Sequence, residues 1–170
     1  MGETVWYRIV GKGRTVREEV LPSRSGRFHE DPETEPASYA GDSLLTVWRE
    51  SLSARAGMTR VNPGAFRAWR IRMRGVTMVD LRKAVERKRL GITQAELAAI
   101  PASPKCREVA RALRSWRTEI HGILYGSVQN PPNGICAAFF LERAQSALSL
   151  ARVPEEKWKE FLKTVIKEIP

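Results

Sequence analysis

The chain has 170 residues, of which 42% are hydrophobic and five are tryptophan, so it can form one domain with a packed core but hardly two. No apolar run is long enough to span a bilayer, and the first residues lack the pattern of a secretory leader, so we expect a single cytoplasmic domain over residues 1–170. The net charge of +10 predicts an anionic partner, which could be nucleic acid, a phosphorylated metabolite or an acidic protein.

The N-terminal third predicts a strand, a long loop and a helix. Residues 5–10 are rich in aromatic and β-branched side chains, which favour a strand. Residues 11–37 are rich in glycine, proline and charge and predict a long loop, a type of segment that often carries function. A helix is expected from a cap at Asp42 or Ser43 to about Ala56, because its apolar residues recur at helical spacing.

Residues 68–76 alternate between two kinds of side chain, which predicts a strand with two different faces. The apolar face consists of Trp69, Ile71 and Met73. The cationic face consists of Arg70, Arg72 and Arg74. We expect the cationic face to be solvated, and the alternative is that it docks an acidic partner or nucleic acid.

The C-terminal half predicts helices and strands in an irregular order. Helices are expected over residues 80–90 and 105–119 and from Pro154 onward, with a capping box at Thr93–Glu96. Inward positions of the helix over 105–119 are Val109, Ala110, Leu113 and Trp116. Strands are expected over residues 123–125, 135–141 and 148–153.

The order of these elements and the two cysteines limit the class of fold and of site. Strands and helices do not follow a regular β-α-β repeat, so we expect an α+β fold with mixed or antiparallel sheets and flanking helices. Cys106 and Cys136 have neither a paired spacing nor neighbouring histidines. They are therefore expected to be buried free thiols, and no metal site is expected.

Four short motifs present an arginine, a tyrosine, a glutamate and a serine in that order. They are Gly26-Arg27-Phe28, Tyr39, Glu50 and Tyr125-Gly126-Ser127-Val128. Each has an ordinary interpretation when considered alone: a surface cation, a packed ring, a solvated carboxylate and a turn residue with a local backbone bond. Because the arginine, the glutamate and the serine are far apart in the sequence but each lies at the edge of an expected element, together they indicate a site that is assembled by folding.

On these motifs the chain resembles the RES-domain family, the toxin half of a class of bacterial toxin–antitoxin pairs named after its Arg, Glu and Ser. The resemblance runs from Trp6-Tyr7-Arg8 to the strand that ends in Ala138-Phe139-Phe140. The chain departs from the family in its strongly basic composition and in a longer stretch between Glu50 and Ser127, which predicts a helical insertion near residues 84–99. The resemblance implies an ADP-ribosyltransferase-like fold, NAD as the substrate, and a helix-turn-helix antitoxin that blocks the site.

The resemblance also implies a role for each motif residue in cleaving the bond between nicotinamide and ribose. Glu50 would stabilise the positive charge that develops on the ribose, and Arg27 would bind phosphate oxygens with two donors. Tyr39 would offer a ring on which nicotinamide stacks, and Ser127 would hydrogen-bond a ribose hydroxyl, the nicotinamide amide or Glu50. Arg8 would add a phosphate contact or, equally, form a salt bridge at the rim of the sheet.

Three functions remain open at this point. The first is a toxin that depletes NAD as a glycohydrolase or phosphorylase, and the second is an ADP-ribosyltransferase that modifies a protein. The third is a basic nucleic-acid-binding module, which the charge favours but which no recognition helix, aromatic platform or zinc finger in the sequence supports.

Overall fold

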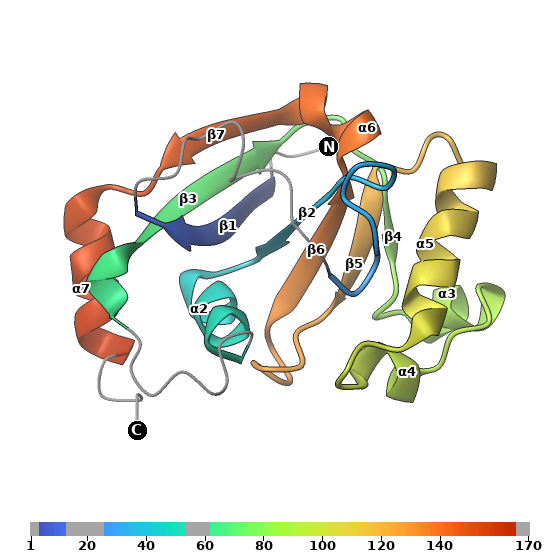
Figure 1. The fold of residues 1–170 in the computed structure, drawn as a ribbon, viewed down its shortest axis with the longest axis horizontal. Coiled ribbons are helices and arrows are strands. Elements are labelled where there is room, and N and C mark those ends of the chain that lie inside the picture. The colour runs from blue at the N-terminus through green and yellow to red at the C-terminus, as the bar shows by residue number, and fades with distance from the viewer. Residues whose placement is uncertain (1–3, 13–25, 54–61, 166–170) are drawn as a thin grey trace.

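The computed structural model describes residues 4–12, 26–53 and 62–165, which form a seven-stranded sheet with the three longest helices on one face (Figure 1). The strands lie in the order β4-β5-β6-β2-β1-β3-β7. Their bounds are β1 Thr4–Gly11, β2 Ala37–Gly41, β3 Phe66–Met73, β4 Met78–Asp80, β5 Gly122–Gly126, β6 Ile135–Phe140 and β7 Leu148–Arg152. The described helices are α2 Leu44–Ser53, α3 Ala84–Arg89, α4 Gln94–Ala98, α5 Pro104–Trp116, α6 Leu141–Ala144 and α7 Glu155–Val165, with short 3-10 turns at Pro63–Ala65 and Gln145–Ala147.

The pairing of the strands confirms the expected α+β class. β4 and β5 are parallel, and the other described strand pairs are antiparallel. Neighbouring strands are joined by helices, turns and loops in an irregular order, as the sequence pattern predicts.

One face of the sheet carries the three longest helices. Tyr7, Gly41, Cys136 and Tyr125 are directly paired across β1, β2, β6 and β5, so their side-chain positions share this face. At one end α2 and α7 cover it, with Trp48 and Trp158 buried between them and the sheet. At the other end α4 and α5 cover the part formed by β5 and β6. Tyr39 on β2 lies on this face between the two pairs of helices, Glu50 lies on α2, and Ser127 follows β5 directly.

The other face of the sheet carries a separate cluster of buried apolar side chains. Trp6, Ile71 and Phe139 are 4%, 0% and 0% exposed, although they come from β1, β3 and β6. The rings of Trp6 and Phe139 meet edge to face at 6.2 Å between centroids. In Figure 1, β1, β3 and β7 run at a steep angle to β5 and β6, so the sheet bends around this cluster.

Most elements are confirmed, with boundaries shifted by a few residues. The Thr93 side chain accepts the Glu96 backbone N–H and the Glu96 carboxylate caps Thr93 in return, so the capping box is present. Ser103 caps α5, because its side chain accepts the backbone N–H of Lys105. The helical segment predicted near residues 84–99 is present as α3 and α4. The expected end of α2 near Ala56 lies outside the described residues.

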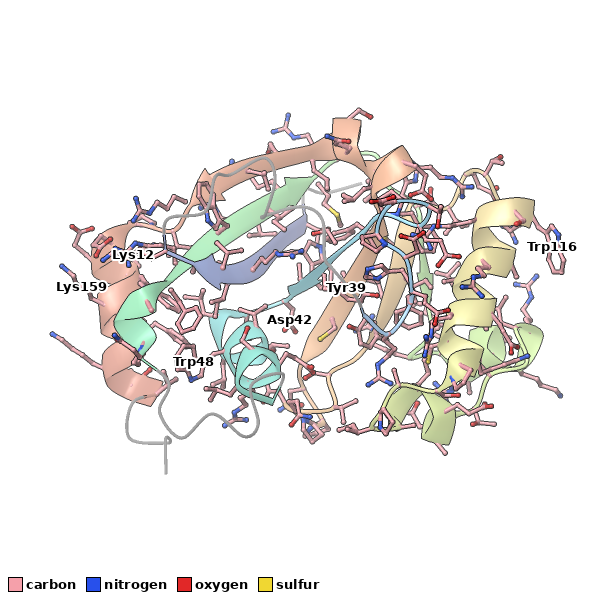
Figure 2. The ribbon with its side chains drawn as sticks, viewed as in Figure 1. Lys12, Tyr39, Asp42, Trp48, Trp116 and Lys159 are labelled. Atoms are coloured by element: carbon pink, nitrogen blue, oxygen red, sulfur yellow. The ribbon has the colours of Figure 1, made fainter. Side chains whose placement is uncertain are left out.

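Three expectations about the elements are wrong. β2 is absent from the prediction, because four of its five residues, Ala37–Gly41, are small and have little intrinsic strand preference. The helix expected from residue 80 begins at Ala84, because residues 78–80 pair with β5 instead. Trp116 is 81% exposed rather than inward, because the apolar stripe of α5 runs past the surface that it packs against; Figure 2 shows its side chain pointing away from the protein.

The strand with two faces is confirmed for its apolar side only. Ile71 and Met73 are buried, as expected. On the cationic side Arg74 is exposed, but Arg70 and Arg72 are half-buried and their Nε atoms are buried. This row is therefore less solvated than the sequence predicts.

Candidate functional site

Glu50 and Ser127 are brought into direct contact by the fold. Glu50 lies near the C-terminal end of α2, and Ser127 is the first residue after β5. The Ser127 hydroxyl donates a hydrogen bond of 2.5 Å to Glu50 Oε1. Ser127 is only 6% exposed, whereas Glu50 is half-buried, so the pair lies at the border between the interior and the surface.

Two further donors converge on the same oxygen of Glu50. The backbone N–H of Gln129 lies 3.4 Å from Oε1, and the thiol of Cys136 lies 3.8 Å from it. Burial and then the negative charge of Glu50 raise the pKa of the Cys136 thiol, which keeps it protonated as a donor. Among the described residues, all hydrogen bonds to this carboxylate end at Oε1, so none of these residues holds Oε2.

Polar residues near Glu50 connect α2 to the loop between β5 and β6. Thr46 lies one helical turn before Glu50 and is 0% exposed. Its hydroxyl donates to Asp42 at 2.8 Å and accepts from the Asn130 side chain at 3.0 Å. Thr46 and Asn130 are not predicted from the sequence. The available signal is that Thr46 lies one helical turn before Glu50, among the apolar residues that begin the helix.

Arg27 lies on the other side of the candidate site, in a tight turn. An isolated bridge between Gly26 and His29 places Arg27 and Phe28 at the tip of the turn. The guanidinium of Arg27 donates to the carbonyl of Ala99 at 3.1 Å, just after α4, and is half-buried. One Nη is thereby fixed, and the planar fork keeps further donors for an anion.

Tyr39 on β2 anchors this turn through its hydroxyl. The hydroxyl accepts the backbone N–H of Phe28 at 2.8 Å and lies 3.0 Å from His29 Nδ1. Burial raises the pKa of the Tyr39 phenol, so it remains neutral, while the residue as a whole is only half-buried. Figure 2 shows Tyr39 near the middle of the sheet. His29, which looks ordinary in the sequence, is 1% exposed and belongs to this anchor.

Gly26 is required by the same contact. A Cβ atom at this position would lie 2.4 Å from the ring of Tyr39, a distance that side chains do not tolerate. The structure gives the reason for this glycine, which is that the backbone of the turn passes directly over the Tyr39 ring.

Tyr125 lies between the two sides of the candidate site. Burial raises the pKa of its phenol well above the usual value, the carboxylate of Glu50 raises it further, and the guanidinium of Arg27 lowers it. Its ring packs edge to face on Phe28 at 5.0 Å, and its strand partner is Cys136, whose thiol contacts Glu50. Tyr125 therefore connects the turn that carries Arg27 to the surroundings of Glu50.

Arg8 is placed differently from the other motif residues. Strand alternation puts it on the face opposite Tyr7, and it donates to Ser38 Oγ at 2.6 Å and to the Tyr39 carbonyl at 3.3 Å. Burial lowers the pKa of its guanidinium to about 10. These bonds connect β1 to β2. Among the described residues, Tyr7 and Gly41 are the one pair in register between these two strands, so the contacts of Arg8 add to a short pairing. A direct contact of Arg8 with a phosphate stays a prediction.

Cys106 and Cys136 are both buried and free, as the sequence predicts. Within the described ranges, no cluster of three or more histidine, cysteine, aspartate or glutamate side chains has the arrangement of a metal site. In the same ranges no helix has the length and hydropathy to cross a bilayer.

Comparison with known proteins gives one family and one related fold. A family model described as the RES domain matches residues 5–160. A crystal structure of the M. tuberculosis MbcT–MbcA toxin–antitoxin complex contains a chain that superposes with a TM-score of 0.67 and 18% identity, covering 94% of this chain and 88% of that one. At this identity the likeness concerns the fold. No curated protein matches the sequence.

Proposed function

Because the chain belongs to the RES-domain family, we propose that it is a toxin that cleaves NAD between nicotinamide and ribose. The observation that carries the proposal is the hydrogen bond between Ser127 and Glu50, which joins the serine and the glutamate of the motifs in one half-buried pair. The half-buried Arg27 lies in the turn whose Phe28 packs on Tyr125, and it supplies the cation that a dinucleotide requires.

Glu50 is assigned the stabilisation of the transition state. Cleavage breaks the bond between the ribose carbon and the ring nitrogen, and nicotinamide leaves as a neutral base with the bonding electron pair. The ribose then carries oxocarbenium-like positive charge, which a fixed carboxylate stabilises. Ser127, Gln129 and Cys136 hold Oε1, so Oε2 can face the ribose. The acceptor that attacks the ribose carbon forms the new bond and, if it is water, loses a proton to solvent.

Arg27 and Tyr39 are assigned to binding. A guanidinium with one Nη fixed can present its remaining N–H groups to the pyrophosphate in a planar fork. The Tyr39 hydroxyl is fixed by Phe28 and His29, which leaves the ring as the part of the side chain that can meet nicotinamide. Binding energy at the phosphates then orients the ribose relative to Glu50.

An antitoxin is the proposed protein partner. The similar fold in the MbcT–MbcA complex is that of a chain in a toxin–antitoxin pair, and the family resemblance implies a helix-turn-helix antitoxin. Such a partner would block the site between Glu50 and Arg27. Adding the product of a neighbouring gene of this type should therefore inhibit the enzyme in proportion to the amount of complex formed.

Release of nicotinamide from NAD tests the proposal. Purified protein is incubated with NAD in water, with phosphate and with cell lysate, and nicotinamide is measured by chromatography. We expect release in at least one condition, and NAD labelled in its adenylate part shows whether ADP-ribose stays free, is phosphorylated or marks a protein band. A labelled band would favour the ADP-ribosyltransferase alternative, and intact NAD in all three conditions would rule out both activities.

A further inference from the structure

Asn130 lies in the loop between β5 and β6, residues 127–134, and has partners for all its polar groups. Its backbone N–H donates to Ser127 Oγ at 3.0 Å, and its backbone carbonyl accepts from Gly134 at 2.8 Å. Its side-chain Nδ2 donates to Thr46 Oγ1 at 3.0 Å, and its Oδ1 accepts from Arg49 at 2.6 Å. One residue therefore both closes the loop and fastens it to α2.

The backbone bond from Asn130 sets the direction of the bond between Ser127 and Glu50. A serine hydroxyl has one proton to donate and lone pairs to accept with. Because the N–H of Asn130 occupies an acceptor position on Ser127 Oγ, the serine proton is available for Glu50 Oε1. Ser127 therefore acts as a donor that fixes one oxygen of the carboxylate.

The side chain of Asn130 sets the position of α2 relative to the loop. Thr46 is completely buried and lies one turn before Glu50, so a bond to Thr46 fixes the height and rotation of the helix face that carries the carboxylate. Arg49, the residue next to Glu50, donates a hydrogen bond to Oδ1 of the same side-chain amide. Both bonds act on the helical turn that contains Glu50.

We propose that Asn130 is a positioning residue, which holds the Ser127 loop against α2 so that Glu50 Oε2 faces the substrate. The proposal rests on the proposed NAD cleavage, because it assigns Asn130 a role in that reaction without contact to the substrate. Thr46 is its partner on the helix. Small displacements of a reacting group are costly, since about 1 Å of misplacement can lower a rate on the order of 100-fold.

The test uses Asn130→Asp, which keeps the backbone bonds and the size of the side chain but replaces the Nδ2 donor by an oxygen that repels the acceptor on Thr46. We expect kcat for nicotinamide release to fall about 10- to 100-fold with little change in KM, because the phosphate side of the site is untouched. The matched control is Asn133→Asp, since Asn133 is exposed in the same loop, and it should behave as the wild type does.

Thr46 provides an independent check of the same bond. Thr46→Val removes the hydroxyl, whereas Thr46→Ser keeps it, so the serine variant should retain more activity than the valine variant. Because Thr46→Val and Asn130→Asp disrupt one shared bond, the double variant should lose much less than the product of the two single losses. A lower melting temperature with an unchanged kcat at assay temperature would reduce Asn130 to a merely structural role and overturn the proposal.

A crystal structure of Asn130→Asp separates this proposal from the proposed function. We expect the distance between Ser127 Oγ and Glu50 Oε1 to exceed about 3.5 Å in the variant, beyond hydrogen-bond range. A preserved contact overturns the positioning role. If the wild-type protein releases no nicotinamide, NAD cleavage fails as the function, and the distance in the variant alone decides whether Asn130 positions the pair.

Discussion

The two sides of the candidate site are held in place by different means. On the glutamate side, polar side chains bond one another between α2 and the loop 127–134, with Ser127, Thr46 and Asn130 each at hydrogen-bond distance from a partner. On the arginine side, the turn over Gly26 is held by a ring under its backbone and by the Tyr39 hydroxyl. Substitutions should therefore change rate on the first side, and binding and stability on the second.

Loss of the carboxylate charge at Glu50 should have the largest effect on activity. In Glu50→Gln the Ser127 hydroxyl can still donate to the amide oxygen, so the fold and the affinity for NAD should be kept. We expect kcat for nicotinamide release to fall by about 100- to 1,000-fold, the usual cost of removing one fixed group that stabilises developing charge. The exposed Glu33 provides the control Glu33→Gln, and equal kcat values for the two variants would contradict the assigned role.

A methyl group at Gly26 should disrupt the arginine side. In Gly26→Ala the new Cβ would lie 2.4 Å from the Tyr39 ring, so the turn must move. We expect a loss of about 1–3 kcal/mol in the free energy of unfolding, measured by urea denaturation, together with a raised KM for NAD. Gly11 has no atom within 4 Å of an added Cβ, so Gly11→Ala should be tolerated, and similar losses in both would show that the ring contact is unimportant.

A conservative change at Arg27 should weaken binding without slowing the chemistry. Arg27→Lys keeps the charge but loses the planar fork and shortens the reach to Ala99. Losing one charge-assisted hydrogen bond of about 1.5 kcal/mol predicts a KM for NAD that is higher by about tenfold, with kcat close to the wild-type value. Arg89→Lys on the exposed side of α3 is the control. A fall in kcat with an unchanged KM would place Arg27 at the reacting bond instead.

The ion pair of Asp80 and Arg82 should affect stability slightly and activity not at all. The Arg82 guanidinium lowers the pKa of the Asp80 carboxyl through hydrogen bonds of 2.7 and 2.8 Å, although partial burial opposes this. A lowered pKa means that the stabilisation is present above the ordinary pKa of aspartate and is lost as the pH falls below it. Asp80→Asn should therefore cost less than about 1 kcal/mol at pH 7, and the difference from the wild type should shrink toward pH 3.

Local patterns in the sequence account for much of the fold. The apolar side of β3, the capping box at Thr93 and the helix α7 each follow a short-range rule, and each is confirmed. β2 forms by pairing with β6, and α3 begins late because residues 78–80 pair with β5. A local sequence pattern does not contain these distant partners. Trp116 continues the apolar stripe of α5 but has no surface to pack on.

In the candidate site, too, some features can be predicted from the sequence and others depend on distant partners. The motif residues could be named from the sequence because the family resemblance identifies them, yet the spacing of α2 alone describes Glu50 as a solvated carboxylate. The contacts that join Glu50 to Ser127 and Asn130 to Thr46 span distant parts of the chain, and the role of Gly26 depends on a ring on another strand. Such partners become visible only when the sheet is assembled.

A crystal structure of the Glu50→Gln variant with NAD bound tests the central claim most directly. The account predicts the pyrophosphate against the Arg27 guanidinium and the nicotinamide ribose beside the side chain at position 50, with Tyr125 beneath. A dinucleotide bound elsewhere on the protein, with Arg27 and residue 50 both out of contact with it, would contradict the account.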